Sequence, residues 1–390
     1  MTVFETFAEA CRIYPDRPWL SVASETAAAY GIEAGDIRYG QAFERVLRLR
    51  AAYADAGYGA GHRVGLLLEN RPAFFQHWLA LNALGCSIVP LNPDLRIMEL
   101  SYIISHSELV AIVALPSRSV SLREAAGGRS VSIVGPDDAP AWAEARGSAR
   151  DEAALLYTSG TTGRPKGCVL PNEYFMVAGR WYARLTGLGT MHPGVERMLT
   201  PLPLFHMNAL AFSAMAMLMT GGCLIQLDRF HPRSWWHTVR ESRASIVHYL
   251  GVMPAILMAD PPNPADRDHQ VRFGFGAGVD AKLHEPFETR FGFPLIEAWA
   301  MTETGAGAVV AANEEPRHVG TYCFGRPGAN VECRIAGEDQ GELLVRHAGE
   351  NPRFGFFREY LKDPNATAEA WDGGWFHTGD VVRRGPDGSL

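Results

Sequence analysis

Residues 157–167 form the densest group of side chains and backbone groups that could bind phosphate. The segment reads Tyr-Thr-Ser-Gly-Thr-Thr-Gly-Arg-Pro-Lys-Gly and follows an apolar run, residues 153–157, that predicts a strand. Hydroxyls, one lysine and the backbone N–H groups that glycine leaves accessible can converge there on phosphate oxygens. It is not a Walker loop, because Pro165 precedes the lysine and Gly167 follows it. We expect a phosphate-binding loop, with a flexible surface loop as the alternative, and its candidate residues are Thr158, Ser159, Gly160, Thr161, Thr162, Gly163 and Lys166.

Alternating strand and helix patterns surround this loop and must position it. Short apolar runs predict strands, and apolar residues at helical spacing predict helices between them. The expected strands are residues 64–68, 87–90, 109–114, 131–134, 153–157, 222–227, 245–250, 273–276 and 294–299, and the expected helices include residues 41–56, 73–84, 174–185 and 209–218. This alternation is typical of a parallel sheet with crossover helices, so we expect an α/β fold.

The sequence pattern changes at two places along the chain. Residues 139–152 are rich in Ala, Arg, Glu and Gly and predict a surface connection. From about residue 325, short strands at residues 331–335 and 341–345 are separated by Gly and Asp, as in a small antiparallel β unit. We therefore expect subdomains at about residues 1–150, 151–324 and 325–390.

Composition narrows the class of protein. The 390 residues carry a net charge of −7, which does not favour a nucleic-acid partner, and 47% hydrophobic residues indicate a folded globular chain. None of the six cysteines forms a CxxC pair, so neither a zinc site nor a disulfide framework is indicated, and a reducing cytoplasm is expected. The most apolar stretch, residues 209–227, is interrupted by Thr220, Gly221 and Gly222, so no membrane span is expected.

A series of motifs in fixed order resembles the adenylate-forming superfamily of acyl-CoA synthetases, luciferases and peptide-synthetase adenylation domains. Residues 158–167 match the signature loop of that superfamily without a gap. The further matches are residues 201–206, 276–278, 299–303, 325–327, 341–343 and 374–380. The resemblance covers essentially the whole chain and implies two stacked, mostly parallel sheets with flanking helices and a small antiparallel β-barrel-like unit.

The resemblance also implies a role for each motif. The loop from Thr158 to Lys166 would hold the β- and γ-phosphates of ATP, Thr302 would contact the α-phosphate, and Glu303 would bind Mg²⁺. Asp380 would accept hydrogen bonds from both ribose hydroxyls. The other implied nucleotide-binding residues are Gly276, Ala277, Gly278, Trp299, Ala300 and Met301.

Several of the positions in these motifs also have simpler interpretations. Trp299 stands where the family usually has Tyr, and either stacking on adenine or core packing would suit its ring. Thr302 and Glu303 could form a helix N-terminus, and Asp380 could be a turn residue. Ala300 replaces the usual Gly. His206 is expected near the carboxylate to be activated, with a satisfied core histidine as the alternative.

We expect an ATP-dependent acid:CoA ligase of the AMP-forming type, closest to the crotonobetaine/carnitine-CoA ligase branch. Its substrates would be ATP, a small carboxylic acid and CoA, with Mg²⁺ as the metal; the identity of the acid and a homodimer are left open. The expected walls of the acid pocket are Trp181, Phe205, Tyr249, Gly251 and Val252, with His206, His248 or Arg184 as polar groups.

Two other functions remain as alternatives. A carrier-protein-loading adenylation domain would carry an acidic anchor near the glycine turn, where Asp280 lies. A nucleotide-binding module without turnover is the second. In the family a C-terminal domain follows the ribose-binding aspartate, so residues 1–390 are expected to be the N-terminal part alone, with low activity by itself.

Overall fold

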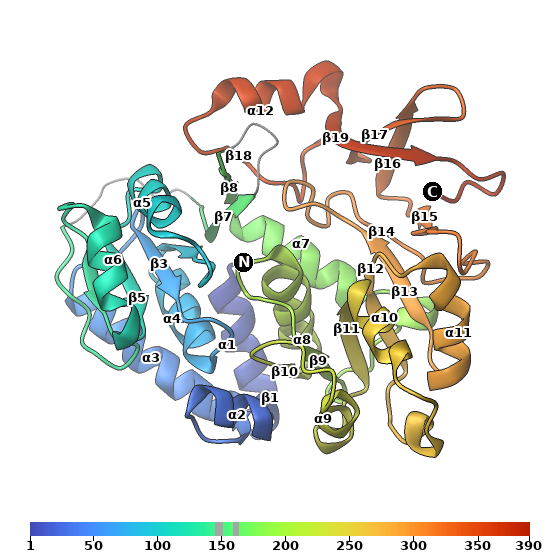
Figure 1. Cartoon of the computed structure of the whole chain (residues 1–390). Coiled ribbons are helices and arrows are strands. Elements are labelled where there is room, and N and C mark those ends of the chain that lie inside the picture. The colour runs from blue at the N-terminus through green and yellow to red at the C-terminus, as the bar shows by residue number, and fades with distance from the viewer. Residues whose placement is uncertain (145–150, 159–163) are drawn as a thin grey trace.

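The computed structural model describes residues 1–144, 151–158 and 164–390. These residues form two large, mostly parallel sheets with helices between and around them, and a smaller antiparallel sheet near the C-terminus (Figure 1). The expected α/β class is therefore confirmed. In the part of the chain described here, no helix has both the length and the apolar character needed to cross a membrane.

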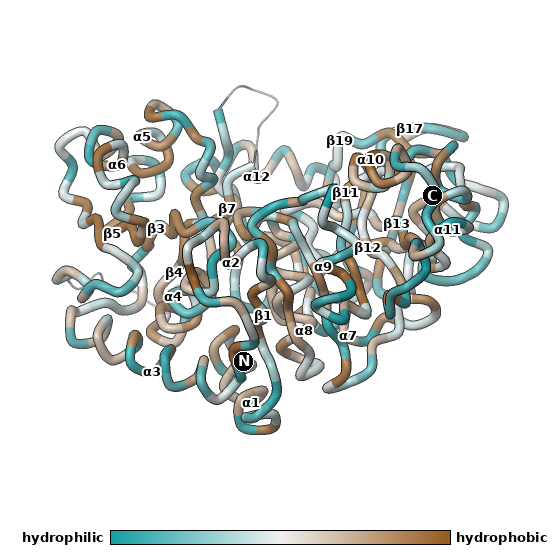
Figure 2. Tube along the Cα trace, turned by 60° about the horizontal axis from the view of Figure 1, so that its bottom comes forward, coloured by the Kyte–Doolittle hydropathy of each residue, from teal (hydrophilic) through white to brown (hydrophobic). Residues whose placement is uncertain are grey.

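The first large sheet has seven strands. In spatial order they are β18 (Glu359–Tyr360), β8 (Lys166–Leu170), β7 (Ala154–Thr158), β4 (Ser87–Pro90), β3 (Arg63–Leu67), β5 (Ala111–Ala114) and β6 (Ser132–Val134). The sheet is parallel from β7 to β6, whereas β8 and β18 run antiparallel to their neighbours. Figure 2 shows hydrophobic residues along β3, β4 and β5. Strands β4 and β5 are buried along their whole length, which explains their continuous apolar sequences.

The second large sheet has nine strands. Their spatial order is β15 (Arg326–Pro327), β14 (Val310–Ala311), β13 (Leu295–Trp299), β12 (Phe273–Ala277), β11 (Ile246–Leu250), β9 (Arg197–Thr200), β10 (Cys223–Gln226), β1 (Pro18–Val22) and β2 (Gly35–Arg38). It is parallel from β13 to β1 and antiparallel at both edges. Since β1 and β2 come from the first 150 residues, this sheet crosses the expected subdomain boundary at residue 150.

Helices α1 (Val3–Ile13), α4 (Pro72–Asn82), α7 (Asn172–Ala183) and α8 (Ala214–Thr220) share one continuous core with strands of both large sheets. Helices α7 and α8 approach closely at Gly179, where a Cβ atom would lie 2.7 Å from the Cβ of Met215. This packing links the two sheets into one body. The remaining helices are α2 (Ser24–Tyr30), α3 (Tyr39–Asp55), α5 (Ile97–His106), α6 (Ser119–Ala126), α9 (Trp235–Glu241), α10 (Val252–Ala259), α11 (Ala281–Phe291) and α12 (Pro364–Ala370).

Short turns of helix complete the connections. The expected helix at residues 209–218 is instead a π-helical segment, η3 (Asn208–Ser213), that continues into α8. The other short turns are η1 (Pro116–Arg118), η2 (Gly187–Gly189), η4 (Pro264–Arg267) and η5 (Asp372–Gly374).

The C-terminal region forms a three-stranded antiparallel sheet, in the order β16 (Val331–Ala336), β17 (Gln340–His347) and β19 (Phe376–Arg383). The predicted strands at residues 331–335 and 341–345 fall within β16 and β17. Of the expected surface connection at residues 139–152, residues 145–150 lie outside the described part.

Candidate active site

Two of the phosphate-loop candidates, Thr158 and Lys166, lie on neighbouring strands of the seven-stranded sheet. Strands β7 and β8 pair in antiparallel fashion, with Thr158 opposite Lys166 at the end of the ladder. Residues 159–163, which include the candidates Ser159, Gly160, Thr161, Thr162 and Gly163, lie outside the described residues. Of the loop candidates, the structure therefore describes Thr158, the last residue of β7, and Lys166, the first residue of β8.

Thr302 and Glu303 follow β13 in a turn at residues 302–308, not at the N-terminus of a helix. Glu303 is 7% exposed, and its Oε1 accepts a hydrogen bond from the hydroxyl of Tyr360 at 2.9 Å. The ammonium nitrogen of Lys166 lies 4.8 Å from the centroid of the same tyrosine ring. Two motifs that are far apart in the sequence, the loop and the Thr302–Glu303 turn, therefore meet at one side chain.

Glu303 has the chemistry that Mg²⁺ requires, because a carboxylate is a hard oxygen ligand. Within residues 1–144, 151–158 and 164–390, no group of three or more His, Cys, Asp or Glu residues is placed to hold a metal ion. A cation at Glu303 would therefore take its other ligands from phosphate and water, which is the usual coordination of Mg²⁺ in nucleotide sites.

The glycine turn after β12 is held by a buried carboxylate from the next strand. Glu297 is 5% exposed and accepts hydrogen bonds from Gly278 N at 2.8 Å, Val279 N at 3.3 Å and the hydroxyl of Tyr249 at 2.7 Å. A Cβ atom on Gly276 would lie 2.2 Å from the carbonyl oxygen of Tyr249, so the chain can pass there only as glycine. The sequence did not single out Glu297, and its role comes from contacts between neighbouring strands.

Trp299 and Asp380 are brought together although they lie 81 residues apart. The indole Nε1 of Trp299 donates to Oδ2 of Asp380 at 2.8 Å, and the indole ring lies 6.2 Å from the ring of Phe324. Asp380 is exposed on β19, and the preceding Gly379 is fixed through its N–H by Glu342 at 2.9 Å. A flat aromatic ring beside a carboxylate at the edge of β13 suits a nucleoside, with the base on the ring and the ribose at the carboxylate.

His206 lies in the segment between β9 and η3, next to Phe205, with ring centroids 4.6 Å apart. Desolvation by the surrounding protein lowers the pKa of its imidazole, so the ring is neutral at pH 7. A neutral imidazole can donate one hydrogen bond to a carboxylate without forming a tight ion pair with it.

The expected walls of the acid pocket fall on two faces of the nine-stranded sheet. Tyr249 packs toward Glu297, whereas His248, the preceding residue, is fully buried on the other face and bonded to the Tyr182 hydroxyl at 2.9 Å. Burial lowers the pKa of His248 to about 3. Tyr249 therefore does not share a wall with Trp181, whose ring contacts Phe212 and Phe275.

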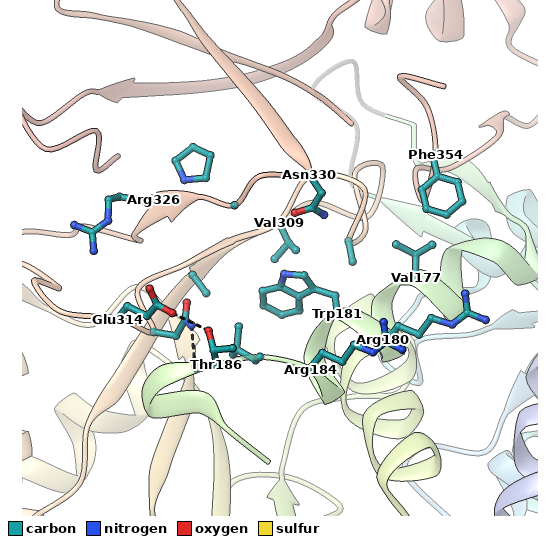
Figure 3. Close-up of a pocket in the computed structure, with 16 residues that line it drawn as sticks. Val177, Arg180, Trp181, Arg184, Thr186, Val309, Glu314, Arg326, Asn330 and Phe354 are labelled. Carbon is teal, nitrogen blue, oxygen red and sulfur yellow. Dashed lines mark hydrogen bonds between the residues drawn. The ribbon is translucent and has the colours of Figure 1, made fainter. Parts of the chain in front are cut away.

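A cavity of about 630 Å³ lies between the end of α7 and strands β14 and β15 (Figure 3). Arg180, Trp181, Arg184 and Ala306 belong to its lining. Trp181 thus stands between this cavity and the rings of Phe212 and Phe275. Arg184, expected among the polar groups of the acid pocket, lines this outer cavity.

Comparison with known proteins identifies the class that this fold and site define. Residues 7–351 match the model of the AMP-binding enzyme family, and the chain belongs to this family. It is 30% identical to a sulfoacetate–CoA ligase of Cupriavidus necator, over 99% of this chain and 77% of the relative. It is 29% identical to a crotonobetaine/carnitine–CoA ligase of Salmonella paratyphi A, over 90% of this chain and 72% of the relative.

Solved structures agree with the fold. A fatty acyl CoA synthetase of Mycobacterium tuberculosis superposes with a TM-score of 0.82 at 21% identity, covering 100% of this chain and 77% of that one. The N-terminal domain of FACL13 from the same organism superposes with a TM-score of 0.83 at 22% identity, covering 100% of this chain and 98% of that one. The fold and the family expected from the motifs are thus confirmed.

Proposed function

We propose that this chain is the nucleotide- and acid-binding part of an AMP-forming acid–CoA ligase. The observation that carries the proposal is that residues 299–303 contact two other parts of the chain. Tyr360 joins Glu303 to Lys166, and Trp299 bonds to Asp380, so this segment and its neighbours offer groups for phosphate, metal, base and ribose. The relatives that are named as CoA ligases support the choice of CoA as the acceptor.

In the first step a carboxylate oxygen of the acid attacks the α-phosphorus of ATP, and the bond to pyrophosphate breaks. Both reactants are anions, so positive and N–H groups must offset their repulsion and stabilise charge at phosphorus. Lys166 and the loop would serve the β- and γ-phosphates, Thr302 the α-phosphate, and the neutral His206 the attacking carboxylate. Magnesium held by Glu303 would neutralise phosphate charge. In the second step the CoA sulfur attacks the acyl carbon, and AMP leaves.

The carrier-protein alternative is weakened by the position of Asp280. Its carboxylate accepts a hydrogen bond from Lys282 N at 2.8 Å and caps the N-terminus of α11. One oxygen of a capping aspartate faces the helix N-terminus, which favours a structural role for Asp280 over an anchor for the amino group of a substrate. We also propose a cytoplasmic location, because all six cysteines are free thiols, as a reducing compartment would keep them.

The test is acid-dependent release of pyrophosphate from Mg·ATP. The acids should be small and should differ in their second group: none, a sulfonate, a carboxylate or a quaternary ammonium. We expect release with at least one acid, followed by acyl-CoA when CoA is added, and loss of release in Lys166→Ala. ATP binding without acid-dependent pyrophosphate release for any acid would instead support the module without turnover.

A further inference from the structure

Tyr360 lies between the two groups of the site that carry opposite charges. Its hydroxyl donates to Oε1 of Glu303 at 2.9 Å, and the face of its ring lies 4.8 Å from the ammonium of Lys166. The described chain contains no ion pair between Lys166 and Glu303. Tyr360 therefore contacts both charged groups, whereas Lys166 and Glu303 form no ion pair with each other.

The segment that carries Tyr360 is fixed on both sides. Phe357 N donates to the carbonyl oxygen of Glu303 at 2.8 Å, which ties the segment to the metal-ligand turn. Leu361 N donates to the carbonyl oxygen of Gly167 at 2.8 Å, and Tyr360 pairs with Cys168 in the sheet, which ties it to the phosphate hairpin. The side chain is thus held at a set position between the two motifs.

Core packing accounts for the ring of Tyr360 but not for its hydroxyl. The residue is 7% exposed and packs on Phe357 with ring centroids 4.8 Å apart, a contact that phenylalanine would make equally well. The hydroxyl instead reaches a carboxylate that is itself buried. A hydroxyl that donates to a carboxylate makes a charge-assisted hydrogen bond, which phenylalanine could not make.

We propose that Tyr360 is a positioning residue that fixes one carboxylate oxygen of Glu303 and keeps Lys166 from pairing with it. This inference rests on the proposed function of the site. A direct Lys–Glu ion pair would neutralise the two groups that must face different partners, the ammonium toward phosphate and the carboxylate toward a cation. A ring attracts the ammonium through its face while its edge hydroxyl satisfies the carboxylate, so both charges remain available.

The test compares Tyr360→Phe, Tyr360→Leu and the control Tyr53→Phe. Tyr53 lies on helix α3, far from Tyr360 in the sequence. The control removes its buried hydroxyl, which donates to His77 Nδ1 at 2.8 Å. Calorimetric titration would measure the affinities for ATP with Mg²⁺, ATP with a chelator, and AMP. Melting temperatures of all variants would separate stability from binding.

Tyr360→Phe should weaken the binding of Mg·ATP about ten- to hundredfold, as expected for one hydrogen bond to a charged group, and leave the binding of ATP without metal and of AMP unchanged. Tyr360→Leu should also weaken the binding of ATP without metal, because Lys166 can then pair with Glu303. The affinity for AMP should remain unchanged. Tyr53→Phe should lower the melting temperature without changing the effect of Mg²⁺.

Two results would overturn the inference while the proposed function stands: a folded Tyr360→Phe with the parent's response to Mg²⁺, or equal weakening of all three ligands. A parent chain that releases pyrophosphate in an acid-dependent way establishes the proposed function independently of either variant. A parent chain that binds no ATP overturns both.

Discussion

Replacement of Glu297 by Ala would test most directly how the glycine turn is held. The carboxylate is buried and accepts three hydrogen bonds, two of them from backbone N–H groups of the turn and one from Tyr249. Removal of the carboxylate leaves Gly278 N and Val279 N without their acceptor, at about 1–3 kcal/mol for each, whereas the Tyr249 hydroxyl keeps the carbonyl oxygen of Ile296 as a partner. We expect Glu297→Ala to lower the free energy of unfolding by about 3–5 kcal/mol, counting the two bonds to the turn and the space that is left.

Glu297→Gln should cost less, for a geometric reason. If the amide oxygen faces Gly278 N, the amide NH₂ can donate to the Tyr249 oxygen, because the Tyr249 hydroxyl can turn fully to the carbonyl of Ile296 at 3.1 Å. Only Val279 N, whose bond at 3.3 Å is the longest of the three, then loses its acceptor. The expected loss is about 1–2 kcal/mol.

Urea unfolding and titration with AMP would measure both consequences. Since the turn is proposed to contact the nucleotide, the affinity for AMP should fall in Glu297→Gln and should fall further in Glu297→Ala. Tyr249→Phe is the matched control: it removes one donor to Glu297, leaves both bonds to the turn, and should destabilise by about 1 kcal/mol with unchanged AMP affinity. An Ala variant that is as stable as the parent, or that binds AMP equally well, would refute the reasoning.

Three further predictions address other groups. Lys166→Ala should weaken ATP by about one to two decades and AMP much less, because only ATP carries the β- and γ-phosphates; equal losses in titration would contradict the role of the loop. Asp380→Ala should weaken the binding of ATP and of AMP alike. Trp299→Phe, which removes the N–H that donates to Asp380, should weaken both to a smaller extent. An unchanged AMP affinity of the Asp380 variant would exclude ribose binding there. Burial raises the pKa of Glu288, but hydrogen bonds from Arg317 and His284 outweigh it and lower that pKa to about 2. The Glu288 contribution to stability should therefore be complete above its ordinary pKa of 4.5 and be lost as the pH falls from 4.5 toward 2, and urea midpoints of Glu288→Gln should depend less on pH in that window than those of the parent.

Many of the buried parallel strands were predictable from the sequence, whereas β1, β2, β8, β9 and β19 were missed and the order of the strands in the sheets could not be predicted. The runs at residues 273–276 and 294–299 fall on β12 and β13, because buried parallel strands are apolar throughout. The pairing of β1 with β10 joins Leu20 to Leu224, and no local pattern specifies a partner at that distance. Likewise, apolar spacing predicted a helix after His206 but could not distinguish a π-helical start from an α-helix.

The residues of the candidate site also differ in whether the sequence alone points to them. The loop, the Thr302–Glu303 pair and Asp380 could be proposed from the sequence because each sits in a short contiguous motif. Glu297 and Tyr360 were missed because their roles come from contacts with residues 19 and 57 positions away. A glutamate in an apolar strand is nonetheless a usable signal, since a carboxylate is rarely buried without donors.

Two hydrogen bonds join distant parts of the candidate site, and they differ in how well they are shielded from water. The bond from Tyr360 to Glu303 is buried and lies between two strands of the seven-stranded sheet and the turn after β13. The bond from Trp299 to Asp380 joins the edge of β13 to an exposed carboxylate on the small sheet, where water competes for both partners. The buried bond lies at Glu303, the proposed metal ligand, where a fixed carboxylate would face charge that changes during the proposed reaction. The bond at Asp380, the proposed ribose contact, can open at lower cost because water can replace it, which would suit a group that has to admit and release a nucleotide.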